Sequence, residues 1–153
     1  MKISKSKLFS LALFTIVLVS CSNAYKFQKS APFKYTRAYF QNWTAAIKIG
    51  SSGVNFHIAN LTPNAGVVID SVYFRKMSGK LISSKGKYVS QLVKRKPISE
   101  GHTLTTTGDF PFKIGNRECV VSYTENGETK YFKITDIIEN EGVYYEDGPP
   151  SKL

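Results

Sequence analysis

The chain has 153 residues, of which 21 are lysine or arginine and 11 are aspartate or glutamate, which gives a net charge of +10. This length suits one domain, and a chain of this size buries roughly two-thirds of its unfolded surface, so it needs no disulfide to fold. Two cysteines in the whole sequence exclude a disulfide-rich scaffold.

The beginning of the chain has the parts of a secretion signal. Lys2, Lys5 and Lys7 give a positively charged start, and residues 8–19 follow as an apolar run of 12 residues. That run is too short to remain in a membrane as a spanning helix, but it fits the apolar segment of a signal peptide. Leucine, valine, serine and cysteine at positions 18–21 complete the signal and resemble the lipobox of bacterial lipoproteins.

The lipobox resemblance implies a covalent anchor at Cys21. In such proteins a signal peptidase cuts before the cysteine, and the sulfur carries a diacylglycerol. Two or more acyl chains hold a protein stably on a membrane. The alternative is an ordinary secretion signal in which the cysteine occurs by chance. The resemblance therefore predicts a protein of the bacterial cell envelope, lipid-anchored in the outer or inner membrane and facing the periplasm.

Four segments are expected along the chain. Residues 1–20 form the signal peptide, residues 21–32 a short polar tether, residues 33–147 one folded domain and residues 148–153 a C-terminal tail. Once the anchor is made, Cys119 is the only thiol left, so no intramolecular disulfide forms. The valines that follow this cysteine predict a buried packing role in a strand rather than a reactive role.

Charge is distributed unevenly along the chain. Residues 22–99 carry 13 basic side chains and one acid, Asp70, whereas residues 100–153 carry 5 basic and 10 acidic side chains. One interpretation is that these are solvated faces that attract each other in the fold. The other is a basic surface near the anchor, which binds anionic headgroups, lipopolysaccharide phosphates or an acidic partner. Nucleic acid is not an expected partner, because no nucleic-acid-binding motif is present.

The domain is expected to consist of β-strands. Runs rich in aromatic and β-branched residues are separated by turn signals, and no stretch keeps a helical period over three turns. The expected strands cover residues 33–40, 44–49, 54–61, 67–76 and 88–93, together with the hairpin described next. This spacing predicts an all-β domain, an antiparallel β-sandwich, immunoglobulin-like or similar, with about 7–9 strands.

The clearest local prediction is a β-hairpin around Asn126 and Gly127. Asn-Gly is the strongest signal for a two-residue type I′ turn, because both positions need a positive φ. The turn fixes the register of residues 118–124 against residues 129–137, and it places Cys119 opposite Ile134. In that register the apolar side chains share one face, so the turn and the alternation agree.

Three short motifs resemble a known group of proteins. They are Tyr-Phe-Gln-Asn-Trp at 39–43, Gly-Ser-Ser-Gly-Val-Asn-Phe at 50–56 and Val-Tyr-Phe-Arg at 72–75. As a set they resemble small lipoproteins common in Bacteroidetes-type bacteria, over about residues 35–140 of the chain. The resemblance implies an envelope protein with an antiparallel β domain. It brings no activity and no site residue with it.

Residues that could carry catalysis or bind metal are not arranged for either purpose. His57 and His102 are far apart in the chain, and no cysteine or acid stands at metal-ligand spacing from them. Residues 50–53 lack the lysine of a phosphate loop and lead into a strand, which predicts a turn. The acids at 139–147 lie in a polar segment that is expected to be solvated. We expect no metal, no cofactor and no enzymatic activity.

The candidate ligand-binding residues are aromatic and basic. Trp43, the single tryptophan, and Tyr39 are candidates for stacking on a sugar ring, with cations supplied by Lys94, Arg95 and Lys96. The alternative for the tryptophan is packing in the core. The leading hypothesis is a non-catalytic interaction or accessory lipoprotein that binds an envelope protein or a polymer. The alternative hypothesis is a lipoprotein that binds carbohydrate, in particular an anionic glycan such as lipopolysaccharide. The third hypothesis is an unrecognised hydrolase.

Overall fold

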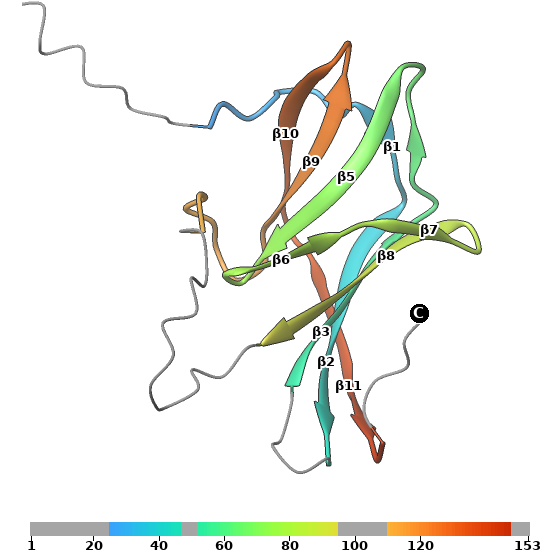
Figure 1. Cartoon of the computed structure of the whole chain (residues 1–153), viewed down its shortest axis with the longest axis vertical. Coiled ribbons are helices and arrows are strands. Elements are labelled where there is room, and N and C mark those ends of the chain that lie inside the picture. The colour runs from blue at the N-terminus through green and yellow to red at the C-terminus, as the bar shows by residue number, and fades with distance from the viewer. Residues whose placement is uncertain (1–24, 47–51, 95–109, 148–153) are drawn as a thin grey trace, which may run out of the picture.

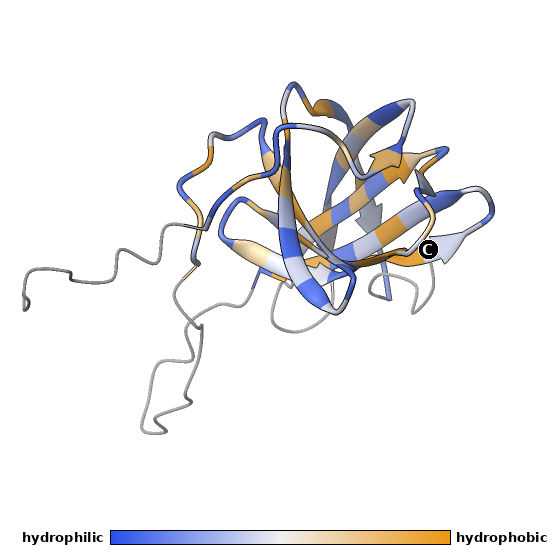
Figure 2. Ribbon diagram, turned by 90° about the horizontal axis from the view of Figure 1, so that it is seen from above, coloured by the Kyte–Doolittle hydropathy of each residue, from blue (hydrophilic) through white to orange (hydrophobic). Residues whose placement is uncertain are grey.

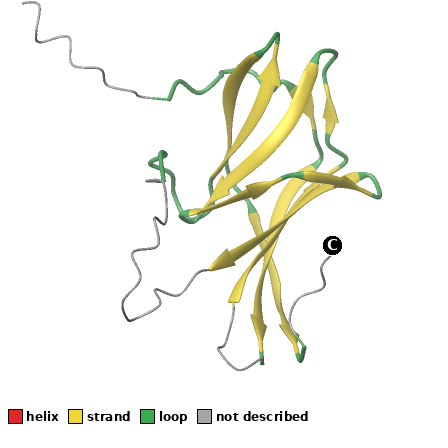
Figure 3. Ribbon diagram, viewed as in Figure 1, coloured by secondary structure: helices red, strands yellow, loops and turns green. Residues whose placement is uncertain are grey.

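The computed structural model describes residues 25–46, 52–94 and 110–147 of the chain. These residues form eleven strands and no helix, and most of the strands belong to two sheets that face each other (Figures 1 and 3). The expected all-β sandwich is therefore confirmed. The strand number exceeds the expected 7–9, because β1, β4 and β7 have only two or three residues each, too few for alternation to mark them.

A four-stranded sheet, in the order β10-β9-β5-β6, forms one layer. All of its neighbouring strands are antiparallel. Its strands are β5 (Val67–Phe74), β6 (Met77–Lys80), β9 (Cys119–Glu125) and β10 (Glu128–Ile134). The expected strand at 67–76 is thus confirmed as β5, with an end two residues earlier. Arg75 and Lys76 have positive φ and turn the chain into β6.

A five-stranded sheet, in the order β11-β2-β3-β8-β7, forms the other layer. Its strands are β2 (Arg37–Ala45), β3 (Ser52–Ala59), β7 (Ile82–Ser84), β8 (Lys87–Lys94) and β11 (Ile138–Tyr145). β1 (Phe33–Lys34) and β4 (Thr62–Pro63) form a separate antiparallel pair. The expectation of an antiparallel fold needs one correction, because β11 runs parallel to β2.

Two expected strands at the start of the domain are divided differently in the structure. The expected strand 33–40 is split between β1 and β2, and β2 continues without a break to Ala45. The expected strand at 44–49 is therefore the end of β2, and its residues 47–49 lie outside the described part of the chain. The expected strands at 54–61 and 88–93 correspond to β3 and β8.

The predicted hairpin is confirmed in turn and register. Asn126 has a φ of 53° and Gly127 a φ of 79°, as a type I′ turn requires. β9 and β10 pair with Glu125 opposite Glu128 at the turn, and Cys119 opposite Ile134 at the far end. The register follows from the sequence, because a slip of one residue would put the apolar side chains of one strand on the same face as the polar side chains of the other.

The core lies between the two sheets and is aromatic at its centre. The ring of Phe74 in β5 lies 4.9 Å from that of Phe40 in β2 and 5.2 Å from that of Phe56 in β3, measured between centroids. At the end of β6 the chain leaves the four-stranded sheet, buries Leu81, and enters the five-stranded sheet as β7. Apolar and polar residues alternate along the strands, as the sandwich requires (Figure 2).

The first described residues pack against the four-stranded sheet. Phe27 forms a parallel bridge with Tyr131 of β10, and the backbone N–H of Gln28 donates to the Tyr131 carbonyl at 2.8 Å. The ring of Tyr25 lies 4.9 Å from Phe112 and 5.1 Å from Tyr131. The segment expected as a tether, residues 21–32, is thus attached to the domain from residue 25 onward.

Candidate functional site

The candidate site is the outer face of the five-stranded sheet, the face turned away from the core. In β2, Ala38 and Phe40 belong to the core, so Tyr39, Gln41 and Trp43 point to the opposite side. Both aromatic residues proposed from the sequence therefore share one surface. Strand pairing brings the outward residues of the other strands into rows beside them.

One row of this face crosses all five strands and is almost entirely apolar or aromatic. It runs from one sheet edge to the other through Ile138, Tyr39, His57, Val89 and Ile82. Its centre is buried, whereas Ile138 is 43% and Ile82 64% exposed at the two edges. Val93, on the same face of β8, is 49% exposed. These aliphatic side chains leave apolar area open to solvent on a face that is otherwise closely packed.

His57 stands at the middle of this row and is 4% exposed. Its ring stacks on Tyr39 with 4.8 Å between the centroids and an angle of 15° between the planes. Burial, together with the nearby charge of Lys87, lowers the pKa of His57 to about 4. The imidazole is therefore neutral at physiological pH, and its buried Nδ1 has no hydrogen-bond partner among the described residues.

A second row places amide side chains side by side. Asn140, Gln41, Asn55 and Gln91 stand at paired positions across four strands. Asn55 is fully buried, and its Nδ2 donates to the Tyr145 hydroxyl at 3.0 Å. Its Oδ1 is buried and has no hydrogen-bond partner in the described part of the chain. The row gives the centre of the face a polar, uncharged character.

Trp43 is buried on this face rather than between the sheets. It stands opposite Gly53, and its indole lies so close over the glycine that an added Cβ would come within 2.6 Å of the ring. The ring of Tyr145 covers it from the side, at 6.4 Å between centroids. Only 2% of Trp43 is exposed, so its ring offers no open face to a sugar. Within residues 25–46, 52–94 and 110–147, the indole Nε1 also lacks a hydrogen-bond partner.

The charges on this face are basic and gather at one end. Arg37 and Lys87 stand in one row with Ala59 between them, and the guanidinium of Arg37 lies 5.4 Å from the centre of the Tyr39 ring. No carboxylate occupies a paired position on this face in the described strands. Lys94 is exposed but alternates with Val93 and so points to the other side of β8. Arg95 and Lys96 lie outside the described residues.

The residues with reactive or metal-ligating side chains are dispersed in the described part of the chain. No three histidine, cysteine, aspartate or glutamate side chains gather closely enough to hold a metal ion in this part of the chain. Cys119 is fully buried in β9, and burial raises the pKa of its thiol, which makes it a packing residue as expected. Asp70 pairs with Lys80 and accepts hydrogen bonds from the hydroxyls of Ser71 and Ser122. The acids of β11 are exposed.

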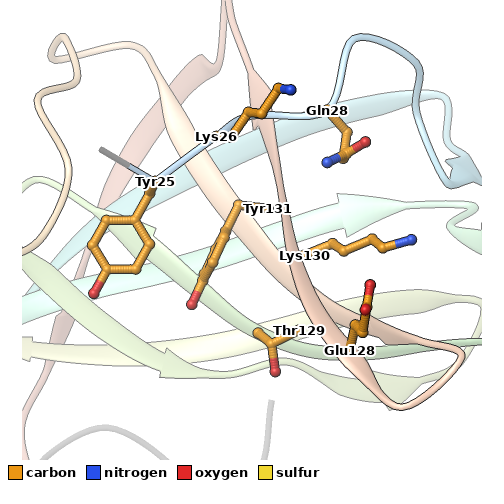
Figure 4. Close-up of a pocket in the computed structure, with 7 residues that line it drawn as sticks. All are labelled: Tyr25, Lys26, Gln28, Glu128, Thr129, Lys130 and Tyr131. Atoms are coloured by element: carbon orange, nitrogen blue, oxygen red, sulfur yellow. The ribbon is translucent and has the colours of Figure 1, made fainter. Parts of the chain in front are cut away.

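A shallow groove of about 530 Å³ lies on the other layer, beside the first described residues (Figure 4). It is lined by Tyr25, Lys26, Gln28, Glu128, Thr129, Lys130 and Tyr131. Lys130 is held at its side by an ion pair with Glu125, 2.8 Å between Nζ and Oε2. Sequence reasoning missed this groove, because it forms only when residues 25–28 lie along β10.

Comparison with known proteins gives no relative for this chain. No protein family, no curated protein and no solved structure matches it. Among the described residues, no helix is long and apolar enough to cross a membrane. The function is therefore argued from the sequence signal at Cys21 and from the geometry of the two outer sheet faces.

Proposed function

We propose that this chain is a lipid-anchored, non-catalytic binding module of the bacterial cell envelope, and that it holds an envelope protein on the outer face of its five-stranded sheet. The anchor is proposed from the lipobox-like residues at 18–21. One observation carries the binding role. An apolar row crosses all five strands and leaves Ile138 and Ile82 exposed at its two ends, with Val93 exposed nearby.

The size and composition of the face suit a protein partner. Four strands of eight or nine residues and the three-residue β7, spaced about 4.8 Å apart, form a plane of roughly 20 by 25 Å that is shorter along β7. This area is comparable to one side of a small interface. Exposed aliphatic side chains gain free energy when a partner covers them, at roughly 25 cal/mol per Å².

The test is a purification of the full-length, tagged protein from detergent-solubilised envelopes. Ile82→Lys and Val93→Lys place a charge in the proposed interface, and we expect each to lower recovery of a stoichiometric protein partner about tenfold or more. Val68→Lys is the matched control, because Val68 is an equally exposed aliphatic residue, 66%, on the other sheet. Equal recovery with all three variants would contradict the proposed face.

A second candidate function, binding of an anionic glycan, is favoured by the charge of the same face. Arg37 and Lys87 stand at one end, Tyr39 is partly exposed, and no carboxylate of the described strands occupies a paired position on this face. Binding of this kind weakens steeply with salt, because screening shortens the range of the attraction. Lipopolysaccharide retention that is lost with Arg37→Glu and kept with Ile82→Lys would support the glycan over the protein partner. Trp43 is too buried to take part as a stacking residue.

A further inference from the structure

The first described residues fix where the chain enters the domain. Residues 27 and 28 pair with β10, and the ring of Tyr25 contacts the rings of Phe112 and Tyr131. Phe27 also lies 5.7 Å from Phe112 between centroids. Aromatic pairs of this kind contribute about 0.5–1.5 kcal/mol each beyond their burial. The segment is therefore part of the fold, on the outer side of the four-stranded sheet (Figure 4).

The length of chain before this segment limits the distance between the domain and an anchor. Four residue steps separate Cys21 from Tyr25. Even a fully extended chain covers only about 14 Å in four steps. A free tether over residues 21–32 would allow about 40 Å on the same basis. Packing of residues 25–28 thus brings this side of the domain close to whatever surface carries the lipid of Cys21.

The segments that form or flank this side carry an excess of basic residues. Residues 25–34, 110–118 and 125–133 together hold seven lysines and arginines and three glutamates. Asp70, whose carboxylate lies near Tyr131, is paired with Lys80. Glu118 and Glu125 are each paired with a lysine of β10. Lys26, Lys29 and Lys113 are exposed and form no ion pair with any described residue. Each lysine near an anionic leaflet shifts partitioning toward the membrane about fivefold.

We propose that the outer side of the four-stranded sheet is the membrane-facing surface of this protein, and that its partner is the anionic bilayer that holds the anchor. The outer face of the five-stranded sheet, on the opposite layer of the sandwich, is then turned away from the bilayer and toward soluble or neighbouring envelope components. The proposal rests on the lipidation of Cys21 in the proposed function. It adds a defined orientation of the domain relative to the bilayer, which a flexible tether would not give.

The test uses the lipidated protein in vesicles of phosphatidylcholine and phosphatidylglycerol that contain a lipid with a nitroxide on its headgroup. A fluorophore is attached to a cysteine introduced either by Thr129→Cys, at the groove, or by Ile82→Cys, on the five-stranded sheet; both residues are exposed. We expect several-fold stronger quenching at position 129 than at position 82. Lys26→Glu combined with Lys29→Glu should reduce this ratio, most clearly at low salt.

A linker control separates the orientation from the anchor. A flexible Gly/Ser insertion of about 12 residues before Tyr25, with a root-mean-square span of about 20 Å, should bring the two quenching values close together while the protein stays on the vesicles. Equal quenching at both positions without the insertion would overturn the orientation alone. Wild-type protein that fails to float with vesicles, like a Cys21→Ser variant, would overturn the anchor and the orientation with it.

Discussion

His57 couples the candidate binding face to pH. The residue is buried against Tyr39, and burial, aided by the charge of Lys87, lowers its pKa to about 4 from an ordinary value near 6.5. The unfolded chain therefore binds a proton more readily than the folded chain between these two values. The stability that the neutral imidazole contributes is complete above pH 6.5 and is lost as the pH falls toward 4.

We expect the free energy of unfolding of the wild type to fall by about 2 kcal/mol more than that of a His57→Phe variant between pH 7 and pH 5. Phenylalanine keeps an aromatic ring against Tyr39 and cannot be protonated. The measurement is urea unfolding of both proteins at the two pH values, followed by circular dichroism. Parallel pH dependences in the two proteins would show that the buried imidazole does not resist protonation.

For individual residues, the sequence predicts which face of the sheet a side chain points to better than it predicts how deeply that side chain is buried. Alternation correctly places Asn55 and His57 on the face opposite Phe56. Side chains that other strands bring alongside contribute to their burial: Tyr39 of β2 stacks on His57, and Tyr145 of β11 contacts Asn55. The sequence of a single strand does not show which side chains of other strands will pack beside it. A polar residue on the outer face is therefore predicted to be solvated.

The hairpin of β9 and β10 is the element that the sequence determines most fully. Its turn, its register and its apolar face all follow from Asn126 and Gly127 and from the alternation beside them. In contrast, β6 and β7 are short, and apolar and polar residues alternate only weakly along them. The sheet that each of them joins depends on the point at Leu81 where the chain crosses from one sheet to the other. The outer edge of β10 is covered by residues 27 and 28, which the sequence shows only as a polar segment.

A Gly127→Val substitution should destabilise the protein by about 1–2 kcal/mol, because a β-branched residue resists the positive φ of 79° at this position. Gly115→Ala is the matched control. An added Cβ at Gly115 meets only ordinary contacts with Glu118, the nearest at 3.6 Å, and its φ is not positive. Unfolding in guanidinium measures the free energy of unfolding of both variants. A loss of stability at Gly115 as large as that at Gly127 would contradict the turn argument.

At the scale of the whole molecule, the two outer sheet faces differ in character. The face of the four-stranded sheet is covered around Tyr73 and Tyr131 by aromatic rings from residues 25–27 and 110–112, and the segments beside it are basic, whereas Val68 on the same sheet is exposed. The face of the five-stranded sheet is uncovered at its edges, where Ile82 and Ile138 are exposed. This asymmetry suits a protein that meets a bilayer on one side and a partner on the other.

The anchor itself is tested by metabolic labelling. Cells grown with radiolabelled palmitate should incorporate label into the wild-type protein and not into a Cys21→Ala variant, because the proposed acylation uses the sulfur of that residue. Cys119 is buried in the core and cannot serve as an alternative acceptor while the protein is folded. Label in the Cys21→Ala variant equal to that in the wild type would contradict the anchor.

The parallel pairing of β11 with β2 has a consequence for how the protein is made. The side chain of Gln41 donates to the carbonyl of Glu141, 100 residues later, and Asn42 donates to Glu139 beside it. While the ribosome is still at work, β2 has β3 on one flank and an open edge on the other, and long-range pairing of this kind forms slowly. In the proposed secretion of this chain, such late closure would leave the polypeptide without its complete five-stranded sheet until β11 has passed through the secretion channel.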